Sequence, residues 1–217
     1  MIAFHIFDMD GTLVDNDCDV SWKLFLVDAG LAPKSDIELA EKYYRDYVDG
    51  VLDLDAFLSF QLREFVGSTH AEMAALCQRH FDTVVRPKCR PGAIAAVREA
   101  AASGKPSTIL SSTNTMISEP VRAFFGITET AGPTLELDAS GRFTGKLVGD
   151  YTLGPQKVVR MRKMAEARGI DPKDIAAYGD SAADIPLLSN VGHPFVVAPS
   201  DELRAEALKR GWPILTW

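Results

Sequence analysis

The chain has few of the features that mark secreted, membrane or nucleic-acid-binding proteins. Its 217 residues include only three cysteines, Cys18, Cys77 and Cys89, with no close pair and no metal-ligand spacing. Reduced thiols in a cytoplasmic protein are therefore expected rather than a disulfide framework. No apolar run is long enough to span a bilayer, and the first residues lack the basic segment of a signal peptide.

Basic residues are also scarce. There are 23 Lys and Arg against 30 Asp and Glu, which gives a net charge of −7. This charge argues against nucleic acid or an anionic membrane as the main partner, but a small anionic substrate needs only a local positive pocket. The 47% hydrophobic content, with no repeat or low-complexity tract, indicates a globular core that forms one domain with a large insertion.

Short apolar runs and helical patterns alternate along much of the chain. The runs predict buried strands at 2–7, 107–111 and 175–179, with shorter candidates at 194–198 and 213–216. Helical patterns cover 92–104 and 157–168, so the fold class is α/β with a parallel central sheet. Two alternating runs flank Ser140-Gly141 and predict a β-hairpin over 135–147.

Residues 18–85 interrupt this alternation with consecutive amphipathic helices. Two sets of apolar residues have helical spacing: Trp22, Phe25, Leu26 and Ala29, and then Phe57, Leu58, Leu62 and Phe65. An insertion directly after the first strand would lie over the carboxyl edge of the sheet, where open α/β folds bind ligands. We therefore predict a core domain of residues 1–17 and 86–217 and a helical cap domain of residues 18–85.

The first predicted strand ends in Asp8-Met9-Asp10-Gly11-Thr12. Carboxylates two positions apart on an extended chain point to the same side, which is costly unless a cation or a proton lies between them. Mg²⁺, which prefers oxygen ligands, suits this arrangement. Taken alone, the motif is equally consistent with an acidic strand end followed by a turn.

Three further segments carry polar groups at predicted strand ends or helix starts. Ser111-Ser112 follows the second strand and could hold a phosphate or simply cap a helix. Lys157 lies in a first helical turn, where the helix dipole disfavours a cation, so it either points at an anion or is solvated. Asp180 and Asp184 follow the third strand. Because parallel strands bring all these groups to one sheet edge, together they indicate phosphoryl transfer, which depends on positioning and charge neutralisation.

These four motifs, in this order, resemble the haloacid dehalogenase superfamily over essentially the whole chain. The helical insertion, the hairpin and the closing Gly192-His193-Pro194 and Arg210-Gly211-Trp212-Pro213 segments are similar to subfamily IB, the branch of phosphoserine phosphatases and histidinol-phosphate phosphatases. The resemblance implies a three-layer Rossmann-like core with a small helical cap of the C1 type. It also implies a Mg²⁺-dependent phosphoric monoester hydrolase.

The resemblance assigns roles to the acidic residues. Asp8 would attack phosphorus and form an aspartyl-phosphate, and Asp10 would serve as general acid and then general base. Mg²⁺ would be held by Asp8, by the carbonyl oxygen of Asp10 and by Asp180. Thr12 would lie beside the metal ligands, and Asp184 would orient the lysine or a metal-bound water.

Other groups would bind the substrate. The Ser111 side chain, the Ser112 backbone N–H and Lys157 would hold the phosphoryl oxygens. In the cap, Asp17 falls where phosphoserine phosphatases have a glutamate that meets the substrate.

Two departures from the family pattern concern the substrate. Ala183 replaces an asparagine of the last motif, and Ser59 stands where phosphoserine phosphatases carry an arginine that clamps the substrate carboxylate. Arg63, one turn further on, is a tentative substitute. Asp17 would suit a cationic amino group, whereas solvation or helix capping is expected for Asp19.

We therefore expect a small phosphorylated metabolite as the partner, an amino-alcohol phosphate such as histidinol phosphate, and neither nucleic acid nor membrane. Phosphoserine is the alternative substrate. A phosphotransferase or mutase on the same core, and a catalytically silent phosphate-binding protein, are alternative functions. The sequence leaves the oligomeric state open.

Overall fold

The computed structural model describes all 217 residues. Its centre is a six-stranded sheet with the order β3-β2-β1-β6-β7-β8, in which every neighbouring pair is parallel. The strands are β1 (Phe4–Phe7), β2 (Ser107–Ile109), β3 (Glu129–Thr130), β6 (Ile175–Gly179), β7 (His193–Val197) and β8 (Ile214–Leu215). Five of them were predicted, and the two-residue β3 was too short to leave a pattern.

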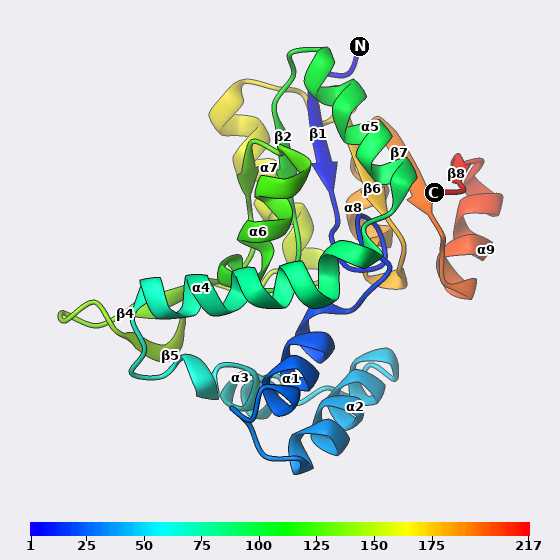
Figure 1. The fold of residues 1–217 in the computed structure, drawn as a ribbon. Coiled ribbons are helices and arrows are strands. Elements are labelled where there is room, and N and C mark those ends of the chain that lie inside the picture. The colour runs from blue at the N-terminus through cyan, green and yellow to red at the C-terminus, as the bar shows by residue number, and fades with distance from the viewer.

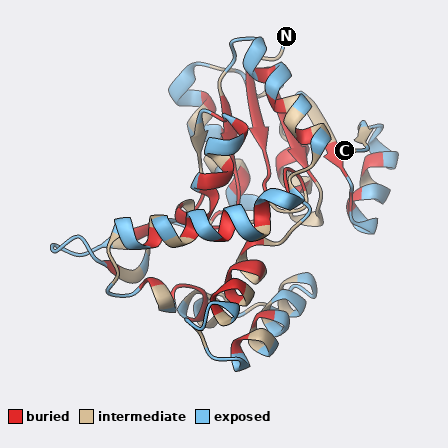
Figure 2. Ribbon diagram, viewed as in Figure 1, coloured by how far each residue is buried: buried red, intermediate tan, exposed pale blue.

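Helices cover both faces of this sheet (Figure 1). On one face lie α5 (Pro91–Ala102) and α6 (Thr115–Phe125), and on the other lie α7 (Pro155–Arg168), α8 (Ile185–Leu188) and α9 (Asp201–Arg210). Successive strand residues alternate between the faces, so Phe7 packs in one apolar cluster and Ile6 in the other. The central strands β1, β2 and β6 are buried throughout (Figure 2), and the predicted three-layer α/β class is confirmed.

The chain between β1 and β2 is helical, as expected. It forms α1 (Cys18–Asp28), α2 (Ser35–Val48), α3 (Leu54–Gln61), α4 (His70–His80) and the short helical turns η1 (Arg63–Phe65), η2 (Phe81–Val85) and η3 (Arg86–Lys88). Helices α1 to α3 lie below the sheet in Figure 1, and α4 runs between them and the core helices. The side chain of Asp17 accepts a hydrogen bond from the Val20 N–H at 2.9 Å and so begins α1.

One apolar cluster continues from the sheet into these helices. It joins Phe7 of β1 and Ile109 of β2 to Trp22 of α1 and Phe65 of η1. The division into a core domain and a separate cap domain at residues 18–85 therefore stays a prediction, because the two parts share buried surface. None of the helices combines the length and apolar content that a membrane span requires.

The predicted hairpin is present as β4 (Thr134–Leu137) and β5 (Phe143–Val148), with Leu135 opposite Leu147. It also binds the loop between η1 and α4. The Phe143 N–H donates to the Ser68 carbonyl at 3.0 Å, and the Gly67 N–H donates to the Phe143 carbonyl at 2.9 Å. The hairpin thus fixes the helical insertion to a segment that follows β3.

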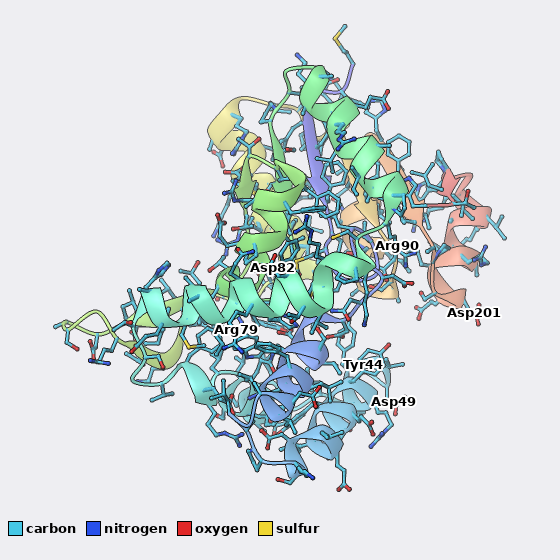
Figure 3. All side chains as sticks on the ribbon, viewed as in Figure 1. Tyr44, Asp49, Arg79, Asp82, Arg90 and Asp201 are labelled. Atoms are coloured by element: carbon cyan, nitrogen blue, oxygen red, sulfur yellow. The ribbon has the colours of Figure 1, made fainter.

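The two connections between the insertion and the sheet run side by side. The Arg90 guanidinium donates to the Asp15 carboxylate at 2.8 Å and to the Gly11 carbonyl at 3.1 Å. The Asp15 N–H donates to the Lys88 carbonyl at 2.8 Å. Figure 3 shows Arg90 where α5 begins. This junction holds the loop after β1 in place just beyond the carboxyl end of the sheet.

Candidate active site

The carboxyl ends of the strands meet the helical insertion at a cavity of about 670 Å³. Because parallel strands all end at the same edge, residues far apart in the sequence converge there. The predicted residues that line this cavity are Asp8 and Asp10 after β1, Ser111 and Ser112 after β2, Lys157 of α7, Asp180 after β6, and Asp17 at the start of α1. The neighbouring Asp184 lies directly behind the cavity wall, fully buried.

Lys157 is the central cation of the site. Its side chain is only 4% exposed, and its ammonium donates to Asp8 at 2.8 Å and to Asp184 at 2.6 Å. Burial alone would lower the pKa of Lys157, but the carboxylates of Asp184 and Asp8 raise it well above its usual value. The lysine that is badly placed for the helix dipole therefore points at anions, and it stays charged.

Asp184 uses its other oxygen for the backbone. That atom accepts from the Asp180 N–H at 3.2 Å, the Ser181 N–H at 3.3 Å and the Ser181 hydroxyl at 3.4 Å. With both oxygens occupied by the protein, Asp184 is suited to orienting Lys157 and the loop after β6.

A carboxylate cluster at this edge fits a divalent cation. One oxygen from each of Asp8, Asp180 and Asp184 lies within 4.8 Å of the others. Burial, followed by the charges of Asp8 and Asp184, raises the pKa of Asp180 to about 9. Lys157 pairs with Asp8 and Asp184 but not with Asp180, so the three carboxylates lack positive charge. Their oxygen atoms are the ligands that Mg²⁺ prefers.

The turn after Asp10 needs its glycine. Gly11 has a φ of +72°, a region that favours glycine, and a side chain at this position would collide with the Asp180 carboxylate. Next to it, the Thr12 hydroxyl donates to Asp180 at 3.0 Å. Thr12 thus lies beside Asp180, where the resemblance placed it.

Both carboxylate oxygens of Asp10 are held by hydrogen bonds. The Cys18 N–H donates to one at 2.8 Å, and the Thr113 hydroxyl donates to the other at 2.7 Å. Burial and the charge of Asp17 raise the pKa of Asp10 to about 7. A carboxyl group with such a pKa is suited to giving and taking a proton near neutral pH.

The polar residues of the segment after β2 have different roles. Asn114 caps α6, because its side chain accepts from the Met116 N–H at 3.1 Å and the Ile117 N–H at 3.3 Å. Ser111 and Ser112 are not needed as caps, and both line the cavity. Helix capping, one of the two alternatives for this segment, is therefore the role of Asn114. The Ser111 hydroxyl oxygen accepts from the Thr113 N–H at 3.1 Å, which leaves its O–H to donate to a ligand.

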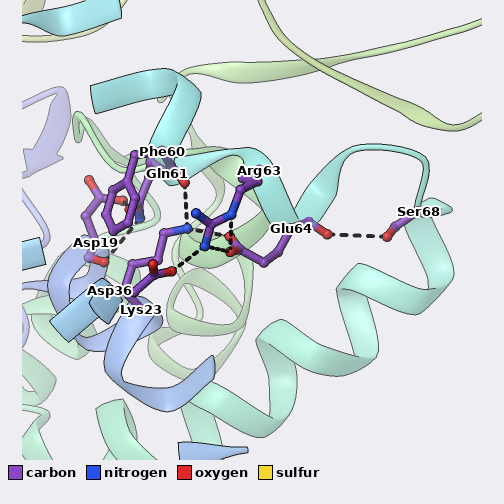
Figure 4. Close-up of polar contacts among 8 residues, drawn as sticks. All are labelled: Asp19, Lys23, Asp36, Phe60, Gln61, Arg63, Glu64 and Ser68. Atoms are coloured by element: carbon purple, nitrogen blue, oxygen red, sulfur yellow. Dashed lines mark hydrogen bonds and ion pairs between the residues drawn. The ribbon is translucent and has the colours of Figure 1, made fainter. Parts of the chain in front are cut away.

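Asp17 and Asp19 both line the cavity. Asp17 lies there while also capping α1. Of the two expectations for Asp19, helix capping is wrong, because Asp17 is the N-cap of α1. The half-buried Asp19 carboxylate accepts from the buried Gln61 side chain at 2.9 Å. Arg63 does not reach the cavity. Its guanidinium donates to Asp36 and, at 2.7 Å, to Glu64 (Figure 4).

The rest of the cavity wall was missed by sequence reasoning. Its aromatic side chains come from α2, α3 and the segment before α7: Tyr43, Tyr44, Tyr47, Phe57, Phe60 and Tyr151. The lining has one basic side chain, Lys157, and seven acidic ones: Asp8, Asp10, Asp15, Asp17, Asp19, Asp180 and Glu202. Away from Lys157, the cavity is therefore acidic and aromatic.

A parallel α/β sheet with acidic residues and a buried lysine at its carboxyl edge, covered by helices, defines an enzyme of the phosphoryl-transfer class. The family model for haloacid dehalogenase-like hydrolases matches residues 6–189, and the chain belongs to this family.

Two named relatives are similar to this chain over nearly its whole length. A histidinol-phosphatase of Neisseria meningitidis is 36% identical over 98% of this chain and 97% of its own length. A phosphoserine phosphatase of Mycobacterium tuberculosis is 28% identical over 99% of this chain and 70% of its own length. A phosphoric monoester hydrolase, as predicted, fits both the family and these names.

Solved structures agree on the fold. A protein of unknown function from Bordetella pertussis has a TM-score of 0.89 at 28% identity, with 99% of each chain covered. A substrate-bound phosphoserine phosphatase has a TM-score of 0.69 at 19% identity, covering 97% of this chain and 98% of its own.

Proposed function

We propose that this protein is a Mg²⁺-dependent phosphomonoesterase that hydrolyses a small phosphorylated metabolite through an aspartyl-phosphate on Asp8. The observation that carries this proposal is the position of Lys157, whose buried ammonium contacts Asp8 and Asp184 in the cavity that Asp10 also lines. A nucleophile, a proton donor and a fixed positive charge thus line one cavity. These are the groups that phosphate ester hydrolysis requires.

In the first step, a carboxylate oxygen of Asp8 forms a bond to phosphorus while the bond to the leaving oxygen breaks. Asp10 gives its proton to that oxygen, so the alcohol leaves neutral. Its pKa of about 7 supplies the protonated form near neutral pH. The Lys157 ammonium and the polar groups of Ser111 and Ser112 hold the phosphoryl oxygens as their charge redistributes.

In the second step, Asp10 takes a proton from water, and the water oxygen attacks phosphorus. The bond from phosphorus to Asp8 breaks, inorganic phosphate is released, and Asp8 returns as a carboxylate. The hydrogen bonds from Cys18 and Thr113 keep the Asp10 carboxyl group in one orientation through both steps.

Asp8, the Asp10 carbonyl and Asp180 would hold Mg²⁺, with Thr12 orienting Asp180. When bound, the ion neutralises charge on the phosphoryl group and on the clustered carboxylates. Without it, Asp8 and Asp180 repel each other, and this repulsion adds to burial in raising the pKa of Asp180.

Removal of divalent metal by a chelator should stop phosphate release, and Mg²⁺ should restore it. Ca²⁺ should inhibit, because it prefers more ligands and longer bonds than an octahedral Mg²⁺ site offers. The test is phosphate release measured after dialysis and after titration with each ion. Full activity in excess chelator would contradict the metal assignment.

The cavity lining favours a cationic leaving group. Beyond the phosphate site it offers no arginine or second lysine to a carboxylate, and Arg63 is engaged elsewhere. A substrate carboxylate would be buried among acids, which is expensive. An amino alcohol avoids this cost, since the acids at the start of α1, including Asp17, attract its ammonium. The aromatic side chains of α2 and α3 would cover an apolar or ring-shaped substituent.

Histidinol phosphate, or another amino-alcohol phosphate, should therefore have a higher kcat/KM than phosphoserine. The size of the difference should be at least about tenfold, because an unpaired buried charge costs several kcal/mol of discrimination. Steady-state phosphate release over a panel of phosphorylated amino alcohols, amino acids and sugars measures this preference. Phosphoserine as the best substrate would refute the substrate class while leaving the phosphatase chemistry in place.

A further inference from the structure

Asp19 is a half-buried acid whose partners in the protein carry no charge. It lies in the first turn of α1, and its carboxylate turns into the cavity. The Gln61 amide donates to this carboxylate at 2.9 Å and to the Asp19 carbonyl at 3.1 Å. Gln61 is only 2% exposed, so it holds Asp19 in a fixed orientation.

The lysine best placed to neutralise Asp19 pairs elsewhere. Lys23 is four residues further along α1, the spacing at which a lysine pairs with a preceding acid on a helix. Instead, its ammonium donates to the Phe60 carbonyl at 2.6 Å and to Glu64 (Figure 4). It also lies 4.2 Å from the centre of the Phe60 ring. Lys23 thus faces away from the cavity.

Every other acid drawn in Figure 4 has a cation. Asp36 pairs with Arg63, and Glu64 pairs with both Lys23 and Arg63, whereas no ion pair involves Asp19. Burial, followed by the charges of Asp17 and Asp10, raises the pKa of Asp19 well above its usual value. A buried carboxylate without a counter-charge is costly, and a cationic ligand would remove that cost.

The position of Asp19 relative to Asp10 indicates which part of a substrate it would meet. The Thr113 hydroxyl lies 2.7 Å from one Asp10 oxygen and 3.4 Å from one Asp19 oxygen. Asp10 would contact the leaving oxygen of the substrate. Asp19 lies next to Asp10, because the Thr113 hydroxyl is near both carboxylates. An ammonium on the carbon next to the esterified carbon would lie near the leaving oxygen, and Asp19 is the acid beside Asp10 that could bind it.

We propose that Asp19, oriented by Gln61, is the residue that selects the substrate by binding the ammonium of the amino alcohol. This inference rests on the proposed phosphatase function and goes further by assigning the selection to one carboxylate. Asp17 contributes negative charge nearby, but its carboxylate is already engaged as the N-cap of α1.

The test compares histidinol phosphate with its analogue that lacks the amino group. Asp19→Asn keeps the shape of the side chain and removes its charge, and Asp28→Asn removes one charge from an exposed position of the same helix. We expect wild type to prefer the amine in kcat/KM, and Asp19→Asn to reduce this preference by about tenfold or more, mainly through KM. Asp28→Asn should keep the wild-type ratio.

Binding of the product alcohol gives a second readout that needs no turnover. Calorimetry should show that histidinol binds at least about tenfold more weakly to Asp19→Asn than to wild type or Asp28→Asn. An equal loss on both phosphate esters, an unchanged preference, or a wild type with no preference for the amine would each overturn the inference. These results differ from failure of the proposed function, in which no phosphomonoester is hydrolysed at all.

Discussion

Asp8→Asn should abolish phosphate release, with kcat reduced by at least about three orders of magnitude, as expected when a nucleophile is removed. An amide lacks the charge and the electron density to attack phosphorus, and it cannot form an acyl phosphate that water hydrolyses in the normal cycle. The amide oxygen can still accept from Lys157, so the fold should persist. Steady-state kinetics and thermal unfolding on the same preparation measure both effects.

The melting temperature of the Asp8→Asn variant gives a second expected result. Asp8 is buried beside two other carboxylates, and burial, partly offset by Lys157, raises its pKa to about 6. Removing one negative charge should leave the melting temperature of the metal-free protein unchanged or higher, because repulsion within the cluster falls. A variant that keeps wild-type phosphate release would show that the covalent mechanism is wrong.

Lys157→Ala should lower kcat/KM by about two or more orders of magnitude, the scale of losing one preorganised transition-state donor. It should also destabilise the fold by about 3–5 kcal/mol, because removing one partner leaves buried charges unpaired. Here those charges belong to Asp8 and Asp184. Added Mg²⁺ should recover part of the stability but little of the rate.

Lys163→Ala is the matched control, because Lys163 lies on the same helix and is exposed. It should change neither the rate nor the unfolding free energy measurably. A change of less than about threefold in kcat/KM for Lys157→Ala would remove Lys157 from the phosphate site, since a preorganised donor contributes far more.

The chemistry at the strand ends could be predicted because its signals are local. An apolar run followed by acids and a glycine identifies the carboxyl end of a buried strand, and parallel strands then bring Asp8, Ser111 and Asp180 together. The poor fit of Lys157 to the helix dipole left an anion contact and solvation as alternatives, and only its combination with the other motifs favoured the anion. The structure explains that position by the contacts of its ammonium with two carboxylates.

Residues whose direction depends on helix packing could not be predicted. Asp19 turns inward because Gln61 of α3 reaches it across 42 residues of sequence, and no local pattern encodes that contact. Thr113 looked like one more polar residue after a strand, yet its hydroxyl holds Asp10. Arg63, considered because it lies one turn beyond the position of the missing arginine, instead pairs with the buried Asp36.

The surfaces against which the helical insertion packs could not be predicted for a similar reason. The pattern that marks 18–85 as helical says nothing about what its apolar faces contact. In the structure, those faces share a cluster with the sheet, and Phe143 of the hairpin packs on Phe65 with ring centres 5.6 Å apart. Helix periodicity therefore located the elements, whereas their partners required the three-dimensional arrangement.

The most direct test of the covalent mechanism is to quench the enzyme in acid during turnover and locate any attached phosphoryl group by mass spectrometry. The protein should be turning over histidinol phosphate, or the best substrate of the panel, with Mg²⁺ present. The mechanism predicts one phosphoryl group on the peptide that contains Asp8, and none in the Asp8→Asn variant. Continued turnover with no adduct, or with an adduct on another residue, would contradict it.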